Sequence, residues 1–227
     1  MGTILASKIV DDAEDILTDS GNGQWAATRL FKYFNIVQRA VVLLKPDASV
    51  TRGAVVLVAG VRQTVPTGGL GLNRVIRNMG TNGTTPGAAI TFIEMDVLSA
   101  CIPDWNTATA SATVVHYMWD ERDPLYYYVY PPQPTSAFGY VDISYPVLPA
   151  NVAAIGNAIT LDDIYEPALI EGLCYYAYLE DAAHSLYAQE RAQWHWNQFV
   201  TLLGRKDLVE ESTAPKPIRI STENAGA

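Results

Sequence analysis

The sequence predicts an α+β protein: an antiparallel helical bundle built from both ends of the chain, with an inserted antiparallel β-sandwich or barrel-like domain. Apolar residues repeat at helical spacing within residues 3–44 and 161–203, and the pattern changes to strand-like alternation within residues 49–150. Neither helical pair is expected to be stable alone, so the economical arrangement packs the two pairs together. The predicted divisions are 1–48, 49–150, 151–204 and an extended C-terminal tail at 205–227.

The N-terminal part is predicted to form two antiparallel helices joined by a short turn. The first is expected over about Thr3–Thr18 with Thr3 as its cap, and the second over about Gln24–Leu44, where Pro46 stops it. In the first helix the residues predicted to face inward are Leu5, Ile9, Ala13, Ile16 and Leu17. In the second they are Leu30, Phe34, Val37, Val41 and Leu44.

The middle of the chain alternates short strand-like runs with clusters of glycine and proline. The candidate strands are Ala54–Ala59, Arg62–Val65, Asn73–Met79, Ala88–Phe92, Thr113–Trp119, Tyr126–Tyr130 and Val141–Tyr145. A short helical turn is predicted at Asp96–Cys101. Within this block Thr113–Pro132 has the signature of a β-hairpin, because two aromatic, β-branched runs flank the polar turn Asp120–Pro124. Since neither face of this hairpin is polar, both faces are expected to be covered.

Helical spacing returns after Leu161. Asp163 and Glu166 match a capping box, and the helix from Ile164 to Leu179 is apolar almost all round, which predicts a central, buried position. A further helix is expected from Glu180 to about Leu203, with Gly204 as its C-terminal stop. The inner stripe of that helix is predicted to consist of Ala188, Ala192, Trp196, Phe199 and Leu203.

Charge and composition exclude several classes of protein. The net charge of −9 and the isoelectric point near 4.7 argue against a protein that grips DNA phosphates with a basic face. No apolar run reaches the roughly 18 residues of a membrane span, and residues 1–4 do not resemble a signal peptide, so a protein without membrane contact is expected. Cys101 and Cys174 are expected to be two buried free thiols rather than a disulfide.

No catalytic, metal-binding or cofactor-binding residues are predicted. The acidic residues between Asp11 and Asp19 fit the exposed face of an amphipathic helix better than a cation site. His116, His184 and His195 have no second ligand at metal-binding spacing, and a Cys101–His116 nucleophile pair has only residue type in its favour.

The aromatic hairpin is the strongest candidate for a binding site. Its aromatic faces are either ordinary core or a platform for sugars, bases or other proteins. Residues 49–150 carry five arginines, no lysine and seven acidic residues, which disfavours nucleic acid and favours a protein interface. The candidate interface residues there are Trp119, Arg122, Tyr126, Tyr128 and Tyr130.

The C-terminal tail holds a second candidate interface. Ile218 and Ile220 alternate with Arg219 after Pro217, which is the pattern of a lone short strand. Because a lone strand is marginal in water, these four residues are expected to pair with a sheet edge on a partner; the alternative is a terminus without a role.

Several segments together resemble the head–tail adaptor, or connector, proteins of tailed bacteriophages, especially the short-tailed podovirus type. They occur in the family's order and cover most of residues 24–204. The matching segments are Val37–Ala48, Leu57–Pro66, Val75–Asn78, Pro103–Trp105, Trp119–Pro132 and Ile159–Asp181.

This resemblance implies a structural virion protein without enzymatic activity or cofactors, assembled in the host cytoplasm and located in the neck of the virion. It implies a dodecameric ring of this chain that joins the portal protein to tail nozzle or tail tube proteins and lets viral DNA pass without specific binding. The tail after Gly204 lies outside the matching segments, and its pairing with the portal is a separate hypothesis that depends on the strand pattern of the tail. Two alternatives stay open: a carbohydrate-binding, host-recognising protein that uses the aromatic hairpin, and a metal-dependent hydrolase that uses the acidic clusters.

Overall fold

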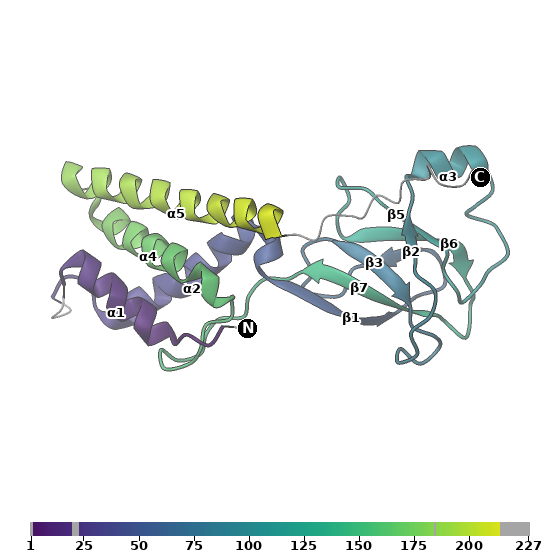
Figure 1. Cartoon of the computed structure of the whole chain (residues 1–227), viewed down its shortest axis with the longest axis horizontal. Helices are drawn as coiled ribbons and strands as arrows, with labels where there is room; N and C mark the ends of the chain where they lie inside the picture. The colour runs from purple at the N-terminus through teal and green to yellow at the C-terminus, as the bar shows by residue number, and fades with distance from the viewer. Residues whose placement is uncertain (1, 20–22, 184, 214–227) are drawn as a thin grey trace, which may run out of the picture. The chain divides into compact units, whose positions relative to one another are not determined.

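The computed structural model describes residues 2–19, 23–183 and 185–213, with side chains described up to residue 204. Its contacts divide the chain into two units (Figure 1). The helical unit comprises the described residues up to Val37 and from Val152 onward, and the β unit comprises Gln38–Asn151. The predicted α+β class is confirmed. The division by contacts falls within the second helix, whereas the sequence placed a boundary after residue 48.

Helix α1 spans Ala6–Leu17, and its N-cap residue is Leu5, whose side chain makes no capping hydrogen bond. The expected cap by Thr3 is therefore wrong. The hydroxyl of Thr3 instead donates to Asp163 Oδ2 at 2.6 Å, so the segment before α1 is held by a residue 160 positions further along the sequence. The buried face of α1 consists of Ala6, Ile9, Val10, Ala13 and Leu17. Leu5 and Ile16, expected inside, are each 46% exposed, because the inward stripe is centred on Val10.

Helix α2 spans Ala27–Leu44. Its predicted stripe is buried except at the last position, since Leu44 at the end of the helix is 49% exposed. The chain leaves α2 through a short 3₁₀ turn, η1 (Pro46–Ala48), in agreement with a stop at proline.

A second 3₁₀ turn, η2 (Asp163–Tyr165), leads into α4 (Glu166–Asp181). The expected capping box of Asp163 and Glu166 is not formed. Asp162 caps the turn by accepting the N–H of Ile164, while Glu166 forms an ion pair with Lys8 of α1. Asp163 is already engaged by Thr3, which explains why it does not cap.

Helix α4 lies at the centre of the helical unit, in contact with α1 and α5 (Figure 1). Gly172 lets α2 and α5 approach α4 closely, because a Cβ there would lie 2.5 Å from Val37 Cγ1 and 3.3 Å from the ring of Phe199. The central position predicted from the all-round apolar sequence is therefore observed.

Helix α5 spans Leu186–Thr213 and passes through Gly204, so the predicted stop there is wrong. A single glycine costs a helix only about 1 kcal/mol, and no proline follows until Pro215. The stripe of α5 is buried as predicted except at Trp196, which is half-buried. His195 beside it is only 2% exposed.

The β unit contains two sheets, with strand orders β1-β7-β3 and β2-β6-β5-β4. The strands are β1 (Val50–Val56), β2 (Gly60–Thr64), β3 (Arg74–Asn78), β4 (Thr91–Phe92), β5 (His116–Trp119), β6 (Tyr126–Gln133) and β7 (Tyr140–Pro146). Each overlaps a predicted strand, and a short helix, α3 (Met95–Cys101), follows β4.

The segment from Ala88 to Ile93 joins the two sheets. The carbonyl oxygen of Ala88 accepts a hydrogen bond from the backbone N–H of Asn78 in β3 at 2.9 Å. The backbone N–H of Ile90 donates to the carbonyl oxygen of Ile76, also in β3, at 3.1 Å. The same segment then runs parallel to β5, where Ile93 donates to Tyr117 at 3.0 Å. The hydrogen bonds are thus continuous from one sheet to the other, as in a partly open barrel.

Candidate functional site

The predicted aromatic hairpin is formed by β5 and β6, with Trp119 opposite Tyr127. Its turn is held by two local hydrogen bonds. Asp120 Oδ1 accepts the N–H of Arg122 at 2.9 Å, and the indole N–H of Trp119 donates to the carbonyl of Pro124 at 3.2 Å. The position of Trp119 is therefore fixed by the turn that follows it.

The inner face of the hairpin belongs to the core of the β unit. Tyr117, Tyr127 and Val129 pack with Val75 and Ile143 from the other sheet. Tyr127 is fully buried, and this burial raises the pKa of its hydroxyl above the usual range. This face holds the barrel together.

The outer face is covered by α3 and the segment that follows it. Met118 and Leu98 are buried there together with Trp105, whose ring meets that of Tyr128 edge-on with centroids 6.3 Å apart. Tyr130 packs against the same cluster. Both faces of the hairpin are therefore covered mainly by the chain itself.

The predicted interface residues differ in how much surface they offer. Trp119, Tyr126, Tyr128 and Tyr130 are half-buried and Arg122 is exposed. The other candidates, Pro217, Ile218, Arg219 and Ile220, lie outside the described residues.

Two adjoining hollows open beside β4 and the end of β5, and both are lined by Phe92 and Trp119. The first, of about 310 Å³, is also lined by Leu72, Asn73 and Tyr117. The second, of about 530 Å³, adds Met95 and four acidic residues: Glu94, Asp96, Asp120 and Glu121. We call these two hollows together the aromatic–acidic groove. Sequence reasoning selected Trp119 but missed Phe92, Glu94 and Asp96.

Phe92 is the exposed element of this groove. Its side chain is 52% exposed, and its ring meets that of Tyr117 edge-on with centroids 5.4 Å apart. The parallel pairing of β4 with β5 brings it there, since Phe92 stands opposite Tyr117 in the register. No local sequence pattern indicates a pairing between strands this far apart, so sequence reasoning could not place Phe92.

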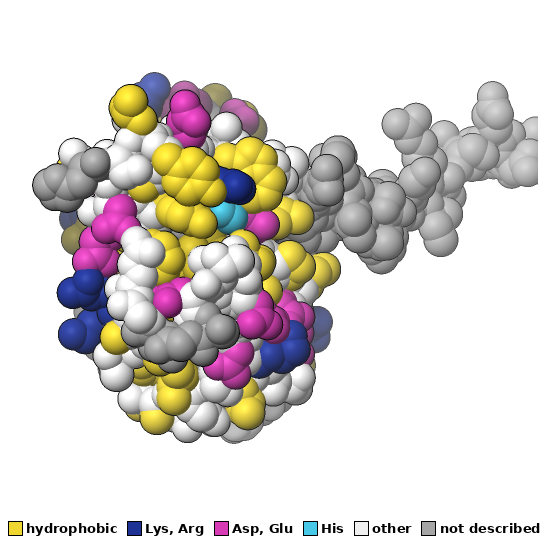
Figure 2. Space-filling model, turned by 90° about the vertical axis from the view of Figure 1, so that its left-hand side faces the viewer, with side chains coloured by type: hydrophobic (Ala, Val, Ile, Leu, Met, Phe, Trp, Pro, Cys, Tyr) yellow, Lys and Arg dark blue, Asp and Glu magenta, His cyan; other side chains and the backbone are white. Residues whose placement is uncertain are grey.

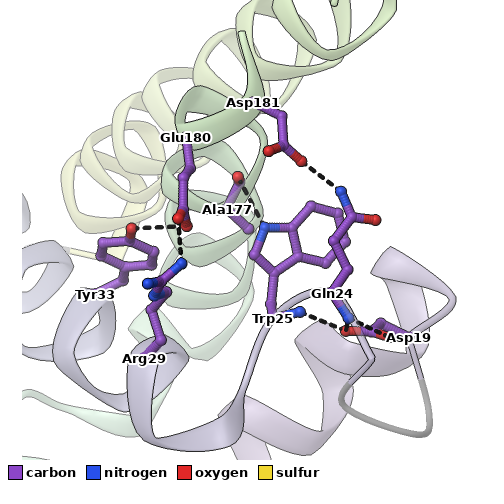
Figure 3. Close-up of polar contacts among 8 residues, drawn as sticks. All are labelled: Asp19, Gln24, Trp25, Arg29, Tyr33, Ala177, Glu180 and Asp181. Atoms are coloured by element: carbon purple, nitrogen blue, oxygen red, sulfur yellow. Dashed lines mark hydrogen bonds and ion pairs between the residues drawn. The ribbon is translucent and has the colours of Figure 1, made fainter. Parts of the chain in front are cut away.

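The helical unit is tied together by polar contacts around Trp25, shown in Figure 3. Asp19 accepts hydrogen bonds from the backbone N–H groups of Gln24 and Trp25, and the indole N–H of Trp25 donates to the carbonyl of Ala177 in α4 at 3.1 Å. Asp19 also accepts a hydrogen bond from the backbone N–H of Gly23 at 2.9 Å. These bonds lower the pKa of Asp19, with the bond from Trp25 as the largest cause.

A second set of contacts in Figure 3 joins α2 to the end of α4. Glu180 binds the guanidinium of Arg29 and accepts the hydroxyl of Tyr33, while Gln24 donates to Asp181. All of these acidic groups serve structural contacts.

One face of the helical unit carries acidic and basic side chains interspersed, with hydrophobic side chains gathered around a basic and a histidine side chain (Figure 2). On α5 the guanidinium of Arg191 lies 5.3 Å from the ring centroid of Tyr187, and Trp194 is 49% exposed. His195 is hydrogen-bonded to Glu171 of α4, with Nδ1 and Oε2 2.7 Å apart. This histidine therefore lies in the contact between α4 and α5.

The remaining candidate chemistry is structural or unsupported. His116 Nδ1 lies 2.6 Å from Thr91 Oγ1, and His184 lies outside the described residues. Both cysteines are free, but Cys101 is exposed rather than buried, because α3 turns it outward from the cluster around Leu98. Among the described residues no group of three or more His, Cys, Asp or Glu is arranged to hold a metal ion. No described helix is long and apolar enough to cross a membrane.

The acidic run on α1 contains one carboxylate, that of Glu14, whose charged form is disfavoured by its surroundings. The pKa of Glu14 is raised by desolvation and by the charges of Asp11, Asp19 and Asp15. Its Oε1 is buried without a hydrogen-bond partner within the described part of the chain. Asp12 is paired with Lys8 at 2.9 Å.

The fold and its surface thus define a two-unit α+β protein whose exposed groove and apolar side chains suit contacts with other proteins. The chain belongs to the SU10 adaptor protein family, whose model matches residues 5–220. It is accordingly a phage structural adaptor protein. No curated protein matches the sequence.

Proposed function

We propose that the protein is a head–tail adaptor that forms a ring in the neck of the virion, joins the portal to the tail nozzle or tail tube, and surrounds the path of the ejected DNA. The observation that carries this proposal is the family match over nearly the whole chain. A dodecameric ring of the short-tailed phage type is the form that the sequence resemblance implies. The protein would have no enzymatic activity and would assemble in the host cytoplasm.

The exposed apolar side chains of the helical unit support a role in contacts between subunits. Leu186 is 80% exposed and Tyr187 59% exposed at the start of α5, close to Trp194 in the same helix. Exposed apolar groups that lie together on one helix are typical of protein interfaces. We assign these residues to contacts between neighbouring copies.

The charge of the chain supports passage of DNA without binding. The net charge is −9, and like charges on the channel wall would repel the phosphates. A channel lined mainly by Lys and Arg would contradict this part of the proposal.

The test is the oligomeric state of the full-length protein mixed with the portal protein of its own phage, measured by native mass spectrometry and electron microscopy. We expect a closed ring of this chain seated on the portal. A chain that stays monomeric and shows no affinity for portal or tail proteins would overturn the proposal.

A glycan array separates the adaptor from the carbohydrate-binding alternative. The adaptor proposal predicts no response to any saccharide. Saturable glycan binding that is lost in W119A would favour the alternative, because the half-buried Trp119 is the tryptophan that lines the groove.

A further inference from the structure

The aromatic–acidic groove has the chemistry of a site for an extended peptide that carries both apolar and cationic residues. Its floor is formed by Phe92, Tyr117 and Trp119, and its rim by the carboxylates of Glu94, Asp96, Asp120 and Glu121. The lining residues include no Lys or Arg. Aromatic rings accept proline and aliphatic side chains, and carboxylates accept ammonium and guanidinium groups.

Among the residues that the structure describes, the four rim carboxylates have no cationic partner. All four are exposed, and none forms an ion pair within the described part of the chain. By contrast, Asp123 in the same turn is matched with Arg62 at 3.9 Å. Like charges gathered on one rim repel one another, so a bound cation would relieve that repulsion.

One segment of the chain has the complementary composition. Residues 214–221 read Ala-Pro-Lys-Pro-Ile-Arg-Ile-Ser, with two cations, two prolines and two isoleucines and no acidic residue. Proline fixes its own backbone angle and restricts the residue before it to extended geometry, so Pro215 and Pro217 favour a polyproline II conformation.

That conformation sorts the side chains of the segment by chemistry. Polyproline II has three residues per turn and rises about 3.1 Å per residue, so Lys216 and Arg219 would lie on one edge about 9 Å apart. Pro215 and Ile218 would share a second edge, and Pro217 and Ile220 a third. One cationic edge between two apolar edges matches an aromatic floor bordered by carboxylates. The β-strand expected from the alternation of Ile218 and Ile220 would place Lys216 and Arg219 on opposite faces, so binding in the groove is a different proposal from pairing with a sheet edge.

We propose that the aromatic–acidic groove binds residues 214–221 of a second copy of this chain. Each copy would then hold the tail of a neighbour, which clasps adjacent subunits together. This extends the proposed ring, because it needs two copies side by side, but the binding itself can be measured without a ring.

The first experiment is zero-length carbodiimide cross-linking of the full-length protein, which joins lysine amines to carboxylates in contact. An equal mixture of ¹⁴N- and ¹⁵N-labelled chains is used. We expect Lys216 of one chain to be joined to Glu94, Asp96, Asp120 or Glu121 of the other. Cross-links of Lys216 to Asp104 or Asp123, cross-links only within one chain, or a link that forms only to added portal protein would overturn the proposal.

The second experiment measures binding directly by fluorescence anisotropy. The probe is a fluorescein-labelled peptide of residues 212–223, and the receptor is the full-length K216E/R219E variant. The reversed charges prevent the receptor's own tail from competing with the peptide for the groove. We expect saturable binding of the peptide to this receptor. The dissociation constant should rise at least tenfold when the receptor also carries E94Q/D96N/D120N/E121Q or F92A. D104N serves as the matched control and should leave binding unchanged.

The outcomes separate this inference from the proposed function. Loss of peptide binding with an intact ring would overturn the groove assignment alone. Peptide binding by a protein that never forms a ring would support the groove assignment and count against the adaptor ring. Equal binding by receptors with and without the rim carboxylates would overturn the inference, provided that both variants keep the wild-type near-ultraviolet circular dichroism.

Discussion

Gly172 and Gly204 are both glycines within helices, yet their surroundings are opposite. A Cβ at Gly172 would meet Val37 and Phe199, whereas a Cβ at Gly204 would meet nothing within 4 Å. We expect G172A to lower the free energy of unfolding by about 1–3 kcal/mol through overpacking. G204A should raise it by about 0.5–1 kcal/mol, because alanine is the better helix former. Chemical denaturation measures both, and equal effects of the two changes would contradict the described packing of α4.

Two partly buried carboxylates, Asp163 and Asp19, make the helical unit sensitive to acid. The pKa of Asp163 is lowered mainly by the hydroxyl of Thr3, and that of Asp19 mainly by the N–H of Trp25. A lowered pKa in the folded state means that the stabilisation is present above the unfolded pKa of about 3.9 and is lost as the pH falls through the folded values. We expect the melting temperature to drop below about pH 4. D19N/D163N should show a flatter profile, and an unchanged slope would contradict these assignments.

At the scale of elements, α3 acts as a cover for the outer face of the hairpin. Leu98 is 2% exposed against Met118, while its neighbour Val97 is 48% exposed. We expect L98A to lower the free energy of unfolding by about 2–5 kcal/mol, the usual cost of emptying a buried leucine site. V97A should change it by less than about 0.5 kcal/mol. A small effect of L98A would indicate that α3 does not pack on the hairpin. Tyr128 and Tyr130 would then be available for contacts with other proteins.

The ion pair between β1 and β7 has an asymmetric environment. Arg52 is mostly exposed, but the carboxylate of Asp142 that it binds is only 8% exposed. We expect R52A to lower the free energy of unfolding by about 1–3 kcal/mol, because it leaves a buried acceptor without its partner. D123N removes the ion pair of Asp123 with Arg62, whose side chains are both 54% exposed. This change should alter the free energy of unfolding by no more than about 1 kcal/mol. Urea denaturation of both variants checks this contrast.

Helices and strands could be predicted from the sequence because each depends on spacing within a few residues. The buried stripe Leu30, Phe34, Val37 and Val41 follows from helical spacing alone. The end of α5 was missed because the cost of Gly204 is small beside the helix-forming residues after it. The capping box was missed because Asp163 is held by Thr3 from the other end of the chain.

The aromatic–acidic groove could not be predicted either, because it also depends on contacts between residues that are distant in the sequence. Trp119 could be selected from composition, but only the sheet pairing brings Phe92 and Glu94 beside it.

At the scale of the whole molecule, each unit carries one cysteine. Cys101 is exposed in the β unit, and Cys174 is buried in the helical unit, where burial raises the pKa of its thiol to about 12. A thiol reagent should therefore label one site per native chain rapidly, and C101S should remove that fast reaction. Labelling of Cys174 should follow only as the helical unit opens. Rapid labelling of C101S under native conditions would contradict the described burial.

The helical unit is assembled from segments that lie on either side of the whole β unit in the sequence. During synthesis α1 and α2 leave the ribosome long before α4, against which both pack. At translation rates of about 5–20 residues per second, this separation amounts to a delay on the order of ten seconds. The β unit is continuous in sequence and can fold in that interval. The apolar faces of α1 and α2 stay open meanwhile, so they are the surfaces that a chaperone would meet first.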